Sequence, residues 1–319
     1  MYLSTSFLKS SASRLGFSAC GVAPAASVDG GVADTFRQWI AEGNHAEMAY
    51  LANNVEKRLD PTLLVEGAQS VVSVALNYYP AKLLDAESQY EFAWYAYGQD
   101  YHEVMKNRLN ELAEALLADV GGEVHYRVFC DTAPVLERYW AWRCGLGWIG
   151  KNTQLIIPRA GSAFFLGEII IDRPFTNYDE PMEGRCGTCT KCLNACPTKA
   201  LVKPYMLDAR RCLSYLTIEY RGETLPIEAA HAMGNCVYGC DRCQQTCPWT
   251  QFAYPTEVEE FMPKAEFATL SRGQLQHLTV EEYCHVFRGS AVKRAKYEGL
   301  MRNVRAVGAA ILWDMDDDG

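Results

Sequence analysis

The cysteines of this chain are concentrated in one stretch and most strongly constrain how it can fold. Nine of its 13 cysteines lie between positions 186 and 247. The first run has the spacing C-x2-C-x2-C-x3-C-P and consists of Cys186, Cys189, Cys192 and Cys196, followed by Pro197. This spacing is typical of bacterial ferredoxins, in which three close thiolates bind one [4Fe–4S] cluster and the fourth binds the other cluster. The run therefore predicts a compact module held together by its metal ligands.

A second run repeats the ending C-x2-C-x3-C-P but lacks a cysteine three residues before its first member, so the missing ligand must come from Cys212 or Cys236. Exchange of the last cysteine between the runs predicts two ligand sets. One set is Cys186, Cys189, Cys192 and Cys247, and the other is Cys196, Cys240, Cys243 and one of the two candidates. A structural zinc site of four thiolates is the alternative. It is disfavoured because zinc does not require the tight four-cysteine run that ends in proline.

The remaining composition limits the location and class of the protein. The chain has 319 residues, enough for about two domains, and no apolar run long enough for a secretory signal or a membrane span. Without an export signal, the cysteines are expected to be reduced metal ligands, and the compartment is expected to be the cytoplasm. The net charge of −9 argues against nonspecific polyanion binding as the main activity but leaves a local basic patch possible.

Hydrophobic patterning divides the chain into three regions. Residues 1–175 alternate helical and extended patterns, which favours an α/β or α+β domain. These patterns cover 7–15, 35–41, 71–79, 104–117, 124–130, 154–157 and 164–171. Residues 176–255 hold the cluster cysteines, and residues 256–319 have a helical pattern. We therefore expect domain boundaries near 176 and 256.

Two segments of the first region bear superficial resemblance to cofactor motifs. Residues 145–152 are rich in glycine, but they follow a predicted helix, whereas a dinucleotide loop follows a strand. They form either a tight turn that needs positive φ or a place where the backbone approaches a cofactor or phosphate. Asp100 and His102 are similar to a cobalamin-ligand motif whose glycine is missing here, so His102 is not assigned as a cobalt ligand.

Four segments in order, 130–138, 145–152, 208–219 and 239–249, together resemble the epoxyqueuosine reductase family, and the resemblance covers nearly the whole chain. It implies a cobalamin-binding α/β (α+β) domain, a ferredoxin-like domain with two [4Fe–4S] clusters and a short helical C-terminal region. The implied activity is reduction of epoxyqueuosine at the wobble position of a tRNA with a GUN anticodon, the last step of queuosine synthesis. Implied partners are reduced flavodoxin or ferredoxin as electron donor. No membrane is expected, and we expect a monomer.

The resemblance also implies roles for particular residues. It selects Cys212 as the missing cluster ligand and leaves Cys236 without a metal. It makes Asp131 the donor of a proton to the departing epoxide oxygen, which requires burial to raise the pKa of this carboxyl group. From the sequence alone, an N-cap would be the simpler role for this residue. Asp131 is also an expected cobalamin contact. The others are Arg58, which has a surface salt bridge as its alternative role, and Lys151, Asn152, Gln154 and Ser214.

RNA contact has separate support from charge. Residues 288–305 hold six basic side chains and one Glu, and Lys199, Lys203, Arg210 and Arg211 form a second basic group. Such groups would follow phosphates, although basic helices are more often solvated faces. The rival functions are a reductive dehalogenase with the same cofactors and a ferredoxin-type electron-transfer module that needs no corrinoid.

Overall fold

A four-stranded antiparallel sheet forms the centre of the N-terminal region. The computed structural model of the protein describes residues 2–118 and 120–316. The strands lie in the order β1 (Ala19–Pro24), β2 (Ser70–Asn77), β7 (Phe164–Ile171) and β4 (Tyr126–Phe129). All three pairings are antiparallel, and every residue of β2 is buried. The predicted strand 164–171 is confirmed at both ends, and the antiparallel order makes this region α+β.

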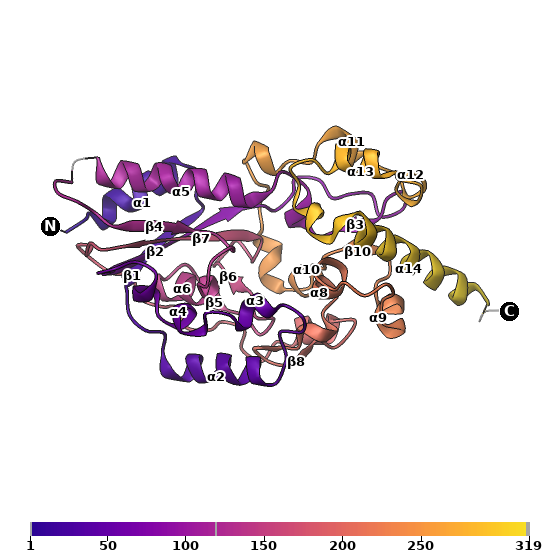
Figure 1. Cartoon of the computed structure of the whole chain (residues 1–319), viewed down its shortest axis with the longest axis horizontal. Helices are drawn as coiled ribbons and strands as arrows, with labels where there is room; N and C mark the ends of the chain where they lie inside the picture. Colours follow the sequence, from indigo (N-terminus) through magenta and orange to yellow (C-terminus); the bar gives the residue numbers. More distant parts are fainter. Residues whose placement is uncertain (1, 119, 317–319) are drawn as a thin grey trace.

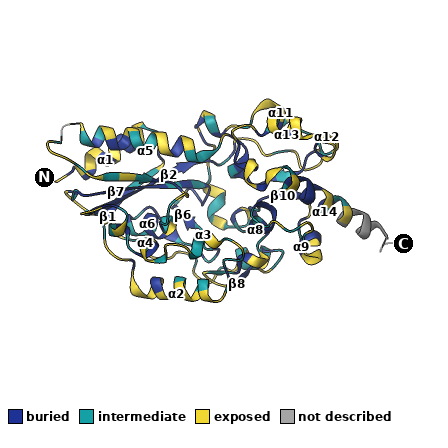
Figure 2. Ribbon diagram, in the orientation of Figure 1, coloured by how far each residue is buried: buried dark blue, intermediate teal, exposed yellow. Residues whose placement is uncertain are grey.

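Helices cover both faces of this sheet (Figure 1). On one face lie α1 (Thr5–Arg14) and α5 (Tyr101–Leu117), and on the other lies α6 (Glu137–Arg143). The outermost helix, α2 (Gly30–Ala41), is largely exposed (Figure 2). Asp100 caps α5, because its carboxylate accepts the backbone N–H of His102. Helices α1, α2 and α5 confirm the helices predicted at 7–15, 35–41 and 104–117.

The cysteine-rich region consists of short elements that are joined to the sheet domain. Strand β10 (Cys236–Tyr238) pairs in parallel with β3 (Glu91–Phe92), although about 140 residues separate them in the sequence. The elements of this region are α7 (Lys191–Ala195), β8 (Leu201–Lys203), β9 (Met206–Leu207), α8 (Leu213–Ile218), α9 (Ile227–Ala232), β10 (Cys236–Tyr238) and α10 (Arg242–Gln245). Further short elements are α3 (Ala49–Ala52), α4 (Val55–Leu59), β3 (Glu91–Phe92), β5 (Trp148–Ile149) and β6 (Leu155–Ile156). Turns of 3-10 helix occur at Pro61–Leu63, Trp94–Ala96, Ala209–Arg211, Pro248–Phe252, Glu259–Phe261 and Ala291–Ala295.

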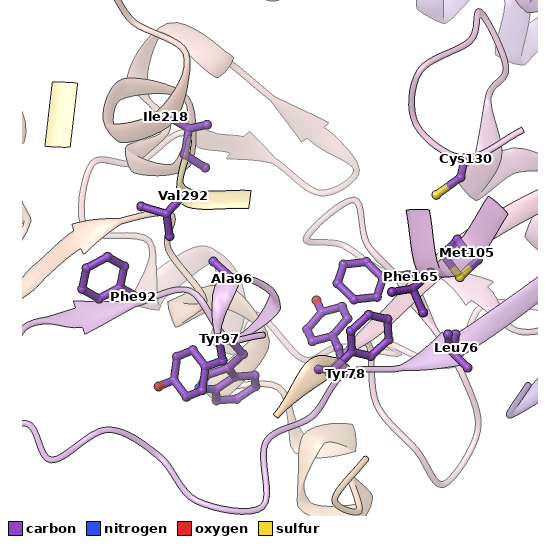
Figure 3. Packing of buried hydrophobic residues seen from close by; sticks show 14 of the residues in the cluster. Leu76, Tyr78, Phe92, Ala96, Tyr97, Met105, Cys130, Phe165, Ile218 and Val292 are labelled. Atoms are coloured by element: carbon purple, nitrogen blue, oxygen red, sulfur yellow. The ribbon is translucent and has the colours of Figure 1, made fainter. Parts of the chain in front are cut away.

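The C-terminal region is helical, as its pattern predicts. It contains α11 (Ala265–Ala268), α12 (Arg272–Gln276), α13 (Val280–Val286) and α14 (Lys296–Asp316), while residues 317–319 lie outside the described part. Capping boxes begin α12 and α13. One hydrophobic cluster joins residues from all three regions, among them Leu76, Phe92, Ile218 and Val292 (Figure 3). The domain boundaries near 176 and 256 stay predictions.

No helix in the described part of the chain combines the length and the apolar character needed to cross a membrane.

Candidate functional site

The eight predicted cluster ligands separate into two groups that line two different cavities. A cavity of about 240 Å³ is lined by Cys186, Cys189, Cys192 and Cys247. A larger cavity of about 1030 Å³ is lined by Cys196, Cys212, Cys240 and Cys243. The exchanged-ligand pattern predicts this division for seven of the cysteines, and Cys212, the eighth, is the candidate that the family resemblance selects. Cys236 lines neither cavity. Its thiol is buried and donates to the carbonyl oxygen of Gly239 over 3.0 Å.

Two short helices explain how each cysteine run serves both cavities. Helix α7 carries Cys192 and ends just before Cys196, while α10 carries Cys243 and ends shortly before Cys247. The two helices pack against each other. Four residues correspond to about 6 Å along a helix, so the cysteine on each helix and the cysteine that follows it reach different cavities.

The chemistry of both sets fits an iron–sulfur cluster. In a cubane each thiolate binds a different iron, so the four sulfurs surround the cluster and do not meet at one ion. Within residues 2–118 and 120–316, no three His, Cys, Asp or Glu side chains form a single-ion site. Sulfur also receives backbone support, because the N–H of Ala200 donates to Sγ of Cys196 over 3.2 Å.

We call the four cysteines of the smaller cavity the first cysteine set and those of the larger cavity the second cysteine set. The larger cavity lies between the sheet domain and the second set. Its walls include Tyr101 and His102 at the start of α5, and Asp131 in the loop that follows β4. Small-molecule sites usually have volumes of about 300–1,000 Å³, so this cavity suits a large ligand. Of the predicted cofactor contacts, it brings together Asp131, Asn152, Gln154 and Ser214.

The glycine-rich segment acts as a tight turn. Gly145 has φ +74°, and a Cβ there would lie 2.8 Å from the carbonyl oxygen of Glu180. A Cβ on Gly147 would lie only 2.2 Å from the carbonyl oxygen of Ile156, in the partner strand of the β5–β6 hairpin. Both glycines are therefore required by contacts within the protein. The turn that follows directs Asn152 and Gln154 to the large cavity.

Asp131 is held in a left-handed conformation by three neighbours. Its φ is +57°, and its carboxylate accepts the hydroxyl of Tyr101 over 2.5 Å. Nε2 of His102 lies 3.5 Å from the same carboxylate oxygen, and the carboxylate of Glu137 accepts the backbone N–H of Asp131. The N-cap alternative is wrong, because Leu136 occupies the N-cap position of α6.

The pKa of Asp131 departs from the expectation of a raised value. Burial raises it, but hydrogen bonds from His102 and Tyr101 outweigh this effect and leave the pKa below its usual range. Hydrogen bonds to Asp100 and Asp131 raise the pKa of His102 to about 9. The Asp131 side chain is 58% exposed, and this exposed part faces the cavity. The pair therefore keeps its proton on the imidazole, next to an ionised carboxylate.

Two further carboxyl groups lie behind this pair and were missed by the sequence argument. Burial, followed by repulsion from Asp131, raises the pKa of Glu137 to about 8. Glu168 on β7 is fully buried, and its carboxyl group accepts the hydroxyl of Ser73 over 3.0 Å. Burial, with the nearby Glu137, raises the pKa of Glu168 as well. Both groups therefore hold a proton more readily than a free glutamate does.

We expect Glu137→Leu to release the Asp131 loop, because it removes the acceptor of the Asp131 backbone N–H. A hydrogen bond contributes about 0.5–1.5 kcal/mol net, so the ordered loop should become about 3- to 10-fold less populated. The single-turnover rate of a reaction that depends on Asp131 should fall by the same factor. Glu137→Gln is the matched control, since its amide oxygen still accepts this hydrogen bond. Equal rates for the Leu and Gln variants, with iron content unchanged, would contradict this positioning role.

Two predicted cofactor contacts, Arg58 and Lys151, do not line the large cavity. Arg58 is buried and donates to the carbonyl oxygens of Tyr50 and Val135, at 3.1 and 3.4 Å, so the surface salt bridge considered for it is wrong. The ammonium group of Lys151 donates to the carbonyl oxygens of Gly187 and Cys189, at 2.6 and 2.9 Å. Lys151 therefore stabilises the first cysteine run and lines the smaller cavity.

Tyr101 and His102 were also missed as members of the site. Their local signal was the sequence Asp100-Tyr-His102 at the start of a predicted helix, because an N-cap aspartate fixes where the following side chains point. Nothing in the local sequence indicates that this helix end meets the loop at Asp131, 30 residues further along.

The basic group in the C-terminal region has mixed roles. Arg302 is 6% exposed and donates to the carbonyl oxygens of Leu216, Tyr220 and Gly222, so it is a structural residue and cannot contact phosphates. Arg294 forms an ion pair with Glu219 at 2.8 Å. Lys293 and Arg294 are exposed and line the large cavity, so they form part of its basic rim.

Comparisons with known proteins agree with this geometry. The family model described as "Epoxyqueuosine reductase QueG, DUF1730" matches residues 58–132, and "4Fe-4S double cluster binding domain" matches residues 185–250. The chain is 46% identical to an epoxyqueuosine reductase of Cyclobacterium marinum, over 95% of this chain and 96% of that protein. It is 44% identical to the one of Pseudomonas aeruginosa, over 85% and 76%.

Solved structures show the same likeness. An epoxyqueuosine reductase with an epoxyqueuosine-modified tRNA-Tyr stem loop superposes with a TM-score of 0.87 at 31% identity, over 95% of this chain and 80% of that one. The Bacillus subtilis enzyme, with its catalytic loop swung out of the active site, gives 0.85 at 30% identity, over 95% and 80%.

Proposed function

This chain belongs to the epoxyqueuosine reductase family and is an oxidoreductase, and we propose that it reduces epoxyqueuosine in tRNA to queuosine. The observation that carries the proposal is one cavity bordered by a cysteine set on one side and by the Asp131–His102–Tyr101 group on the other. The reaction needs two electrons and two protons. Both C–O bonds of the epoxide break, a C=C bond forms, and the oxygen leaves as water.

The lining of the large cavity supports cobalamin as the group that it holds. Asn152, Gln154 and Ser214 offer amide and hydroxyl groups suited to the amide side chains of a corrin ring. When bound, cobalamin supplies the strongly reducing centre and the [4Fe–4S] clusters supply single electrons. We propose a reduced flavodoxin or ferredoxin as the electron source, the cytoplasm as the place of action and a monomeric state.

In this proposal Asp131 and His102 act as a proton-holding pair. The oxygen of an opened epoxide departs readily only when it is protonated, so a donor beside the cavity has a clear role. The proton rests on the imidazole of His102, 3.5 Å from the carboxylate of Asp131, and both side chains line the cavity. Asp131 therefore passes the proton to the oxygen, and Tyr101 orients its carboxylate.

The His102–Asp131 pair predicts how the single-turnover rate depends on pH. Because the pKa of His102 is raised from 6.5 to about 9, the imidazole stays protonated below that pH and loses its proton above it. We expect the single-turnover rate to fall as the pH rises through about 9. His102→Gln should lower the rate at neutral pH and remove this midpoint. An unchanged pH profile in the His102→Gln variant would show that the proton comes from elsewhere.

Removal of the corrinoid tests the proposed function directly. Protein purified without oxygen from cells supplied with cobalamin should show corrinoid absorption and convert epoxyqueuosine to queuosine in tRNA. Corrinoid-free protein should keep its iron but have no turnover. Full turnover without corrinoid would contradict the cofactor assignment. Iron–sulfur absorption with no corrinoid uptake would instead favour the electron-transfer module, and activity on organohalides but not on tRNA would favour a dehalogenase.

A further inference from the structure

We propose that the exposed face around the first cysteine set is the docking surface for an acidic electron-carrier protein. This inference rests on the proposed function and adds the place where electrons enter. We call this surface the donor face and define it by Arg185, Lys191, Lys199, Val202, Lys203 and Tyr205.

The position of the two cysteine sets determines which one an outside protein can reach. The second set lines the large cavity, which the proposed function fills with cofactor and substrate. The first set lines the small cavity, and the residues around it are open to solvent. From 184 to 191, every residue except the two partly buried cysteines is exposed. A donor that approaches from solvent therefore meets the first set.

The charge of the donor face is opposite to that of the whole chain. Residues 184–207 contain four basic side chains and no acidic one, and all four are exposed, whereas the chain has a net charge of −9. Of the flanking acidic residues, Glu183 is exposed, and Asp208 is buried and hydrogen-bonded to Arg210. A concentrated positive face on an acidic protein favours a negatively charged partner and accelerates encounter.

Apolar side chains lie beside these charges. Val202 is 48% exposed and Tyr205 is 53% exposed, both in the β8–β9 hairpin segment. The N–H of Tyr205 donates to the carbonyl oxygen of Lys151 over 3.0 Å, and the ammonium group of Lys151 binds the carbonyl oxygen of Cys189. The hairpin is thus fixed against the first cysteine run. An apolar centre with a charged rim is common in protein interfaces, and complexes of redox proteins are small.

RNA is the competing partner for a basic surface. The substrate nucleotide must reach Asp131, which lines the large cavity, and this cavity has its own basic rim at Lys293 and Arg294. Arg185 of the donor face lines the other cavity, whose cysteines all belong to the first set, and the hairpin that carries Lys203 is hydrogen-bonded to Lys151, which lines that cavity too. We therefore assign Lys203 to the donor and not to the RNA phosphates predicted from the sequence.

Charge reversal with two reductants tests the assignment. The K191E/K203E variant, assayed with reduced flavodoxin at low salt, should show a second-order reduction rate at least about tenfold lower than wild type, with a weaker salt dependence. Dithionite is a small reductant that needs no docking, so turnover with dithionite should be unchanged. K106E/K82E, two exposed lysines elsewhere on the chain, is the matched control. K203E alone lies outside the cysteine run and repeats the test if the double variant loses iron.

Three results would overturn the donor face: an unchanged rate with flavodoxin, an equal loss with the control variant, or a weakened affinity for the modified tRNA stem loop with normal donor kinetics. The last result would make this surface an RNA site. Failure of the proposed function is a different result, since wild-type protein would then show no turnover with dithionite either.

Discussion

Asp131→Asn is expected to lower the single-turnover rate on epoxyqueuosine tRNA by about 10²- to 10⁴-fold, the usual contribution of general acid catalysis. The substitution is well matched to the site. Asn tolerates the φ of +57° that this position requires, and its amide oxygen still accepts the hydroxyl of Tyr101. The substitution removes the ability to carry a proton, together with the negative charge that helps to raise the pKa of His102. Iron content and corrinoid binding should therefore equal those of the wild type.

Asp29→Asn provides a control of the same chemistry. The carboxylate of Asp29 also accepts a tyrosine hydroxyl, from Tyr139 over 3.0 Å, but Asp29 does not line the large cavity. Its variant should turn over normally. Pre-reduced enzyme is used so that slow electron delivery does not limit the rate. Near-wild-type single turnover by cobalamin-loaded Asp131→Asn would rule out the proton-donor role.

Cys212→Ala is expected to abolish turnover and to remove one cluster, while Cys236→Ala keeps both. Two cubanes require about eight iron atoms per chain, so Cys212→Ala should retain about four. The two variants should differ because the two cysteines lie in different places. Cys212 lines the large cavity together with Cys196, Cys240 and Cys243, whereas the thiol of Cys236 is buried in β10 and donates to a carbonyl oxygen.

Iron analysis and absorption after anaerobic reconstitution measure this difference. Cys236→Ala also serves as the control for the loss of a thiol from this region. If Cys236→Ala lost the iron and Cys212→Ala retained it, the ligand assignment would be reversed. If wild-type protein bound about four irons, or zinc in their place, the two-cluster assignment itself would fail.

The sequence predicts features that depend on neighbours along the chain. The largely apolar pattern of 164–171, interrupted only by Gly167 and Glu168, is enough to define β7. The cysteine spacing is enough to divide seven ligands between two sets. The choice between Cys212 and Cys236 needed the family resemblance, because both lie upstream of the second run and spacing does not separate them. The structure distinguishes them by burial and hydrogen bonding.

Features that depend on distant contacts could not be predicted in this way. The pKa of Asp131 is set by His102 and Tyr101, which belong to another element, so burial alone gave the wrong direction. Arg302 belongs to a basic sequence segment, yet its guanidinium caps carbonyl oxygens near the end of α8. In both cases the tertiary fold provides partners that the local pattern does not contain.

The exchange of one cysteine between the two runs also has a consequence for biosynthesis. The first three ligands of one cluster are made early, but the fourth, Cys247, follows 55 residues after Cys192, and the other cluster needs Cys243. Neither cluster has its full ligand set until the ribosome has passed these positions, which are only four residues apart. Metal binding is coupled to folding in such modules. Both clusters are therefore expected to be inserted together, after most of the chain has been synthesised, and a nascent chain truncated before residue 243 should complete neither.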